Sequence, residues 1–220
     1  MKTSEQTLGA LVIRHPEAAK FFHQHGLDFC CGGKQSLAQA CAARGLDPEA
    51  VLLELETTVP EQLDTVRWEL RPIAELVAHI LARYHAPLRG ELTRLVELSG
   101  KVERVHAAKP DCPAGLTDLL EEVRSSVGSH LEEEERILFP MILAGRGALA
   151  HMPIEVMQME HQDHGRNLAR IRSLTCDLHI PAHACASWRE LYSSLSRLEV
   201  ELMEHIHLEN NILFPRVINA

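Results

Sequence analysis

The sequence predicts an all-α protein in which a small amino-terminal helical domain precedes an up-down-up-down four-helix bundle. Four long segments, roughly 72–107, 115–144, 153–176 and 185–218, carry apolar residues three and four positions apart, which is the period of an α-helix packed on one face. Helix breakers separate these segments at Pro110 to Gly115, Gly145 to Pro153 and Pro181. Such short connections favour antiparallel neighbours in a bundle.

Start and stop signals place four short helices in residues 1–58. Helices are expected to begin near Thr7, Pro16, Ser36 and Pro48, and glycines at 26 and 45 suit helix ends. Residues 59–71 are predicted to form a linker, and residues 72–220 the bundle.

The apolar stripes of the four long segments include histidines and glutamates. The predicted stripes are Val77, Leu81, His85, Leu88 and Leu92; Leu120, Val123, Val127, His130, Glu134, Ile137 and Met141; Ile154, Met157, His161, His164 and Leu168; and Leu191, Leu195, Leu198, Leu202, His205, Glu209 and Ile212. Histidine from each helix is therefore expected to point inward at one level. Pro87, with Gly90 close behind, is expected to bend the first helix beside His85.

A duplicated motif indicates a metal site. His130 and Glu134 precede Phe-Pro, and the same string recurs 75 residues later (205 minus 130) as His205 and Glu209. Histidine and glutamate four residues apart share one helix face, so both can reach one ion. Each copy has an upstream histidine, at His85 or His161, 45 or 44 residues earlier (130 minus 85, 205 minus 161).

Four imidazoles and two carboxylates fit two metal ions. Without thiolate ligands, and in a helical bundle, this set favours iron first, manganese second and zinc third. Glu134 and Glu209 could each bridge both ions. The alternative is that these are core residues held by hydrogen bonds. That alternative is a good explanation for a single inward histidine, but a poor one for six matched positions together. His164 is expected either to neighbour the site or to have no role in it. Glu135 and Glu160 are expected to line an access path or, by preference, to be solvated or ion-paired carboxylates.

Composition restricts the class of protein. The formal net charge of −9 disfavours an extended nucleic-acid surface, which needs clustered Lys and Arg. The amino terminus lacks a signal peptide pattern, and no segment approaches the roughly 18 apolar residues of a membrane span. We therefore expect a soluble cytoplasmic protein whose six cysteines are thiols.

Two adjacent cysteines are candidate reactive thiols. Cys30 and Cys31 lie in the sequence Asp-Phe-Cys-Cys-Gly-Gly-Lys (28–34), where the glycines predict a turn. Lys34 and the helix start near Ser36 are expected to lower a cysteine pKa and favour the thiolate. The alternative is a structural turn with buried thiols.

These motifs resemble the iron-sulfur cluster repair family (repair of iron centres), whose members carry a hemerythrin-like di-iron domain. The resemblance covers nearly the whole chain; Pro87 and Gly90 depart from the family pattern. It implies two non-haem irons, oxo- and carboxylate-bridged, and the repair of iron–sulfur proteins damaged by nitric oxide or oxidants. We expect iron donation or nitric oxide handling assisted by Cys30 and Cys31, rather than a classical enzyme. An oxygen or nitric oxide carrier or sensor, a nitric oxide reductase, and a homodimer stay open.

Overall fold

The computed structural model describes residues 3–58 and 66–219, and these residues form helices joined by turns. The predicted all-α fold is confirmed. The chain divides into two compact units, Met1–Val77 with Leu202–Ala220, and Ala78–Glu201. The boundary falls inside two continuous helices, α5 (Ile73–Ile80) and α10 (Ala186–His207). Of the predicted linker 59–71, residues 59–65 lie outside the described part of the chain.

Four short α-helices occupy the amino-terminal part of the first unit, as predicted. They are α1 (Leu8–Arg14), α2 (Ala18–Gln24), α3 (Leu37–Arg44) and α4 (Pro48–Thr58), preceded by a short 3-10 helix, η1 (Thr3–Glu5). Thr7 caps α1 by accepting a hydrogen bond from the amide of Ala10, and Ser36 forms a reciprocal capping box with Gln39. Gly45 ends α3 in the left-handed conformation, where glycine has no Cβ penalty.

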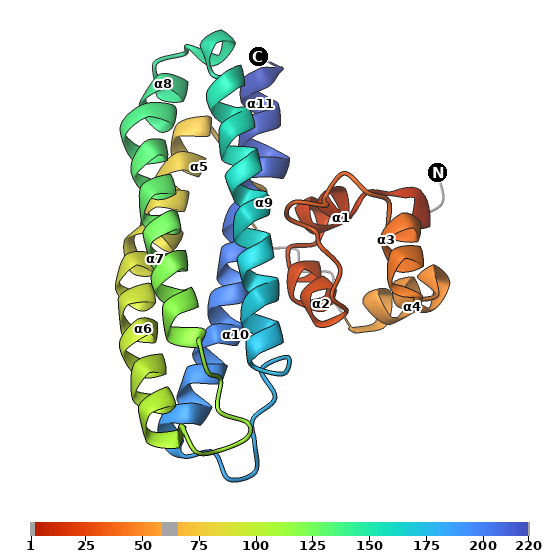
Figure 1. The fold of residues 1–220 in the computed structure, drawn as a ribbon. Coiled ribbons are helices and arrows are strands. Elements are labelled where there is room, and N and C mark those ends of the chain that lie inside the picture. The colour runs from red at the N-terminus through yellow and green to blue at the C-terminus, as the bar shows by residue number, and fades with distance from the viewer. Residues whose placement is uncertain (1–2, 59–65, 220) are drawn as a thin grey trace. The chain divides into compact units, whose positions relative to one another are not determined.

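The second unit contains the bundle. Its helices are α6 (Ala86–His106), α7 (Leu116–Glu133), α9 (His151–Leu174) and most of α10, and they alternate in direction (Figure 1). The short helices α8 (Phe139–Leu143) and η4 (Gly147–Leu149) follow α7. Helix α7 packs between α6 and α9, so its inward face lies in the interior of the bundle.

Three π-helical turns interrupt helical segments of the described chain. They are η2 (Leu81–His85), η3 (Glu134–Leu138) and η5 (Leu208–Leu213), and each is followed two residues later by a proline, at 87, 140 or 215. Proline lacks the amide hydrogen that a regular α-helix needs at this point. A π-turn accommodates the missing bond by widening the helix, and such turns are frequent at functional sites.

The π-turns correct two sequence-based expectations. Pro87 follows the π-turn that ends at His85, so the feature beside His85 is a widened turn rather than a simple proline bend, and it matches those before Pro140 and Pro215. In η3 the extra residue rotates the apolar face, so Ile137 is 55 % exposed whereas Leu138 is buried. The predicted place of Ile137 in the core stripe is therefore wrong.

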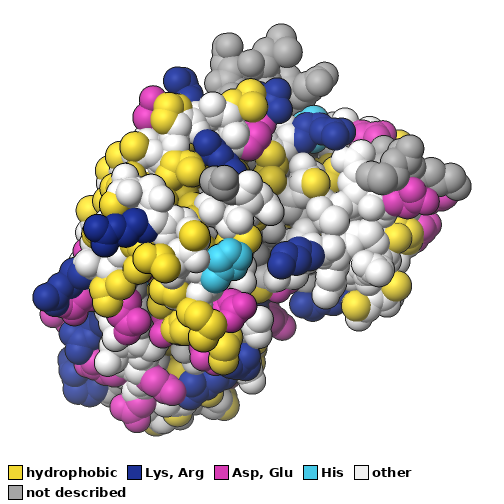
Figure 2. Space-filling model, turned by 90° about the horizontal axis from the view of Figure 1, so that it is seen from above, with side chains coloured by type: hydrophobic (Ala, Val, Ile, Leu, Met, Phe, Trp, Pro, Cys, Tyr) yellow, Lys and Arg dark blue, Asp and Glu magenta, His cyan; other side chains and the backbone are white. Residues whose placement is uncertain are grey.

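The described helices give no sign of a membrane segment, and the visible surface is mixed in charge. Within residues 3–58 and 66–219, no helix combines the length and the hydropathy that crossing a bilayer requires. On the face shown in Figure 2, basic side chains are interspersed with acidic ones. Among the described residues, exposed basic and acidic side chains form ion pairs, for example Arg124 with Glu121 and Arg170 with Glu122.

Candidate metal centre

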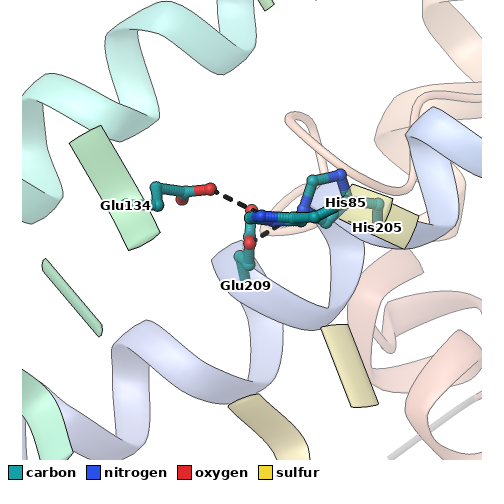
Figure 3. A group of neighbouring side chains, drawn as sticks. All are labelled: His85, Glu134, His205 and Glu209. Carbon is teal, nitrogen blue, oxygen red and sulfur yellow. Dashed lines mark hydrogen bonds and ion pairs between the residues drawn. The ribbon is translucent and has the colours of Figure 1, made fainter. Parts of the chain in front are cut away.

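The six predicted ligand residues occur in two groups of buried side chains. Within each group the candidate ligand atoms lie within 4.8 Å of one another; the groups are His85, Glu134, His205 and Glu209, and His130, Glu134, His161 and Glu209. Figure 3 shows the first group, in which the carboxylates and imidazoles point toward one another. Each group has two imidazoles of its own, and both groups share the same two carboxylates.

Within the second unit, two histidines lie close to the Glu134 carboxylate. His85 Nε2 and His130 Nε2 each lie 3.5 Å from Glu134 Oε2, and Glu134 is fully buried. His130 Nε2 also lies 3.1 Å from His161 Nε2. Two imidazole nitrogens at about 2.1 Å from one ion, in positions at right angles, would be about 3.0 Å apart. The observed spacing therefore suits a shared cation.

The second copy of the motif repeats this arrangement within the first unit. His205 Nε2 lies 2.9 Å from Glu209 Oε1, one helical turn away, and both side chains are buried. Glu209 belongs to η5, as Glu134 belongs to η3. Each glutamate of the duplicated motif therefore projects from a π-turn.

Two further carboxylates form hydrogen bonds with two of the candidate ligand histidines. Glu135 Oε1 accepts a hydrogen bond from His85 Nδ1 at 3.0 Å, and Glu160 Oε2 accepts one from His130 Nδ1 at 2.7 Å. Because an ionised carboxylate only accepts, the hydrogen of each ring is on Nδ1, and Nε2 keeps its lone pair for a metal. Carboxylate–histidine pairs of this kind fix the rotamer and basicity of metal ligands.

The environments of these two carboxylates differ. Burial favours a higher pKa for Glu135, but hydrogen bonds from Arg89 and His85 outweigh it and the pKa is lowered. The pKa of Glu160 is raised, first by burial and then by repulsion from Glu133. Arg89 holds Glu135 with two hydrogen bonds, at 2.9 and 3.1 Å. Glu135 is thus an ion-paired carboxylate, as expected, whereas Glu160 forms a hydrogen bond with His130.

The donor set fits divalent or trivalent metal ions. It combines four imidazoles with two carboxylates that are fully buried. Burying carboxylates without a compensating cation costs several kcal/mol, about the effective penalty for an ion in a protein interior. Nitrogen and oxygen ligands without sulfur suit iron, manganese or zinc. His164, also buried, packs edge-on against His130 with ring centroids 5.0 Å apart.

The cysteine pair lies on a tight turn in the first unit. Asp28 Oδ1 accepts hydrogen bonds from the backbone amides of Cys30 and Cys31, at 3.1 and 2.9 Å. The Cys30 thiol lies 3.3 Å from Asp28 Oδ1 and 3.8 Å from Cys31 Sγ. The six cysteines all lie within the described residues, and none forms a disulfide.

The expected lowering of a cysteine pKa is wrong for Cys30. Its pKa is raised well above the ordinary thiol value, first by the hydrogen bond with Cys31, then by burial and by the carboxylate of Asp28. Lys34, the predicted activating cation, is exposed. Cys30 is therefore a protonated thiol at neutral pH.

The turn is held by side chains of η5. Asn210 Nδ2 donates to the carbonyl of Cys30 at 3.3 Å, and Asn211 Nδ2 donates to the carbonyls of Phe29 and Cys30, both at 3.2 Å. Asn211 also lies 3.1 Å from Nδ1 of the buried His207. Burial lowers the pKa of His207 to about 4, against a weaker opposing effect from the Phe29 backbone, so this ring is neutral at neutral pH.

Sequence reasoning assigned no role to Asn210, Asn211 or His207. All three lie in or beside η5, where the π-turn departs from the regular period, and their contacts join residues about 180 positions apart. The available signal was their proximity to Glu209 and the recurring Phe-Pro string. These features indicate the segment around Glu209, but they do not indicate that it contacts the cysteine turn.

Comparison with known proteins agrees with this geometry. Residues 76–217 match the hemerythrin HHE cation binding domain, and residues 4–59 match the ScdA_N domain, a domain of unknown function (DUF542). The chain is 45 % identical over 223 residues to the iron-sulfur cluster repair protein YtfE of Dickeya chrysanthemi, with both chains covered fully. The chain belongs to the iron-sulfur cluster repair family.

Other members of the family are equally similar along their whole length. Proteins of the same name from Pectobacterium carotovorum and Yersinia pseudotuberculosis are each 44 % identical over 220 residues, again with full coverage of both chains. The similarity to the family therefore includes the cysteine turn as well as the cation binding domain.

Proposed function

We propose that this chain is a di-iron protein that repairs damaged iron–sulfur clusters in the cytoplasm. Its partners would be iron–sulfur proteins damaged by nitric oxide or oxidants. In this proposal residues 1–58 supply thiols, residues 72–220 hold the iron, and residues 59–71 connect them. Full-length similarity to proteins named for cluster repair supports the activity.

The observation that carries the metal proposal is the sharing of two carboxylates by two pairs of imidazoles. One ion would be held by His85 and His205, the other by His130 and His161, with Glu134 and Glu209 bridging both. Two anionic bridges offset the repulsion between two cations only a few ångströms apart. We assign iron first and manganese second, because carboxylate-rich helical bundles are the usual setting for both.

When bound, such an iron pair supplies open coordination positions for nitric oxide or oxygen and can exchange electrons. The protein residues have separate tasks. Glu135 and Glu160 hold His85 and His130 with Nε2 directed inward. Buried apolar side chains around the ligands, including Phe139 next to His85, restrict access of water.

Cys30 and Cys31 would assist the transfer of iron, or of a nitric oxide group, to or from a client protein. Replacement of both by alanine should leave the iron content and absorption spectrum intact and abolish repair of a nitric-oxide-damaged iron–sulfur enzyme in vitro. Cys176 and Cys185, both exposed, offer the matched control: their double alanine variant should repair normally.

The same assay separates the alternatives. Full repair by the Cys30→Ala/Cys31→Ala variant would overturn the role of the thiols. Reversible oxygen binding without any repair would indicate a carrier or sensor in the manner of hemerythrin. Catalytic release of nitrous oxide over many turnovers would indicate a nitric oxide reductase.

A further inference from the structure

Three potential metal ligands converge on the cysteine turn, apart from the two His and Glu groups. Ligand atoms of Asp28, Cys30 and Cys31 lie within 4.8 Å of one another. Asp28 is exposed, Cys31 is half-buried and Cys30 is buried. An ion could therefore reach the group from solvent and become partly enclosed.

We propose that Asp28, Cys30 and Cys31 form a second metal site, which takes a thiophilic divalent cation such as Fe²⁺ or Zn²⁺. The inference rests on the turn alone, so it stands or fails separately from the di-iron function proposed above.

The distances match tetrahedral coordination. Two thiolates at about 2.3 Å from a tetrahedral ion are about 3.8 Å apart, and a thiolate and a carboxylate oxygen at about 2.0 Å are about 3.5 Å apart. The Cys30 and Cys31 sulfur atoms are 3.8 Å apart, and Cys30 Sγ lies 3.3 Å from Asp28 Oδ1. The ligands are thus already spaced for an ion.

The backbone around the group keeps it compact. A Cβ at Gly32 would lie 2.7 Å from the carbonyl oxygen of Asp28 and 3.3 Å from Asp28 Oδ2, so only glycine leaves this side of the carboxylate open. A Cβ at Gly33 would lie 2.6 Å from the carbonyl oxygen of Phe29. Asn210 donates to the Cys30 carbonyl, and Asn211 donates to the Phe29 and Cys30 carbonyls.

Metal binding would replace protons. The ion would form bonds to both sulfur atoms and to the Asp28 carboxylate, and each thiol would lose its proton to solvent, so two protons leave for each ion bound. Because protons compete with the ion for both sulfur atoms, the affinity should increase with pH. Three protein ligands leave a fourth tetrahedral position open, through which the ion could pass to another protein.

Cadmium is a suitable probe because its thiolate complexes absorb in the ultraviolet. The experiment uses the full-length, iron-loaded protein under reducing conditions, with Cys176→Ser and Cys185→Ser to remove the exposed thiols. We expect one cadmium ion to bind per chain with a thiolate charge-transfer band. The band should disappear in Cys30→Ser/Cys31→Ser.

Asp28→Asn is the discriminating variant, because asparagine keeps an oxygen that accepts from the two backbone amides but removes the anionic ligand. Its cadmium affinity should fall roughly tenfold or more. An unchanged titration in Asp28→Asn or in the double serine variant would overturn the proposed site. Circular dichroism and iron content, measured on the same samples, verify that the fold and the bundle are intact.

Discussion

The side-chain amide of Asn211 lies 3.2 Å from the backbone carbonyl oxygen of Cys30. Asn211 follows Glu209 by two residues in the same π-turn, η5. One short segment, η5, therefore carries a proposed bridging carboxylate and also holds the cysteine turn. A displacement of η5 would move both.

Replacement of Asn211 by alanine should loosen the turn. The Phe29 carbonyl would lose the Asn211 donor, whereas the Cys30 carbonyl would keep Asn210. A buried backbone group left without a partner costs about 1–3 kcal/mol. We expect lower stability in urea and faster alkylation of Cys30, measured by mass spectrometry of the labelled peptide. Asn219→Ala, which removes an exposed cap at the end of α11 (Phe214–Ile218), should change neither quantity.

Replacement of Gly33 or of Gly90 by alanine should change the free energy of unfolding in opposite directions. At Gly33 a Cβ would collide with the Phe29 carbonyl and with the Asn211 side chain, so Gly33→Ala should lower the free energy of unfolding by about 1–3 kcal/mol. At Gly90, inside α6, nothing lies within 4 Å of a Cβ. Gly90→Ala should therefore raise the free energy of unfolding by about 0.5–1 kcal/mol. Urea denaturation of both variants tests the pair; a stabilised Gly33→Ala protein would contradict the close packing.

The prolines after the π-turns should matter for metal affinity. Pro140→Ala restores an amide hydrogen and permits a regular α-helix, which would rotate Glu134 relative to Leu138. We expect unchanged or higher helicity with weaker iron retention against a chelator. Pro153→Ala, in the first turn of α9 where the amide has no helical partner, is the control. Equal iron retention in both variants would show that the π-turn does not depend on Pro140.

The carboxylates behind the histidines should also affect the metal. Glu160→Ala removes the acceptor of His130 Nδ1, and Glu135→Ala removes that of His85 Nδ1. Each should weaken metal binding about 10- to 100-fold, as measured by competition with a chelator. The neighbouring Glu132 is exposed and bonds only Arg136 among the described contacts, so Glu132→Ala should behave as the native protein. Similar losses in all three variants would point to net charge rather than orientation.

Much of the fold followed from local signals in the sequence. Helix limits near Thr7, Ser36 and Gly45 were predictable because caps act within one turn. The inward positions of His130, His161 and His205 were predictable because these residues lie on regular α-helix, where the helical period holds. Ile137 was misplaced because a strict period of 3.6 cannot include the extra residue of η3.

The partners of the site residues could not be read in the same way. Glu160 and His130 lie on different helices, and only their packing brings the carboxylate to Nδ1. The pKa of Cys30 was misjudged because Lys34 is close in sequence, whereas burial and the Asp28 carboxylate act through space. Long-range contacts of this kind need the folded chain.

Iron analysis of the purified protein, combined with its near-ultraviolet spectrum, tests the central claim most directly. We predict two irons per chain with oxo-bridge bands, and fewer than two, with the bands lost, in Glu134→Ala and in Glu209→Ala, while Glu132→Ala keeps both. Native iron content and spectrum in the Glu134 and Glu209 variants would contradict a centre built on two shared carboxylates.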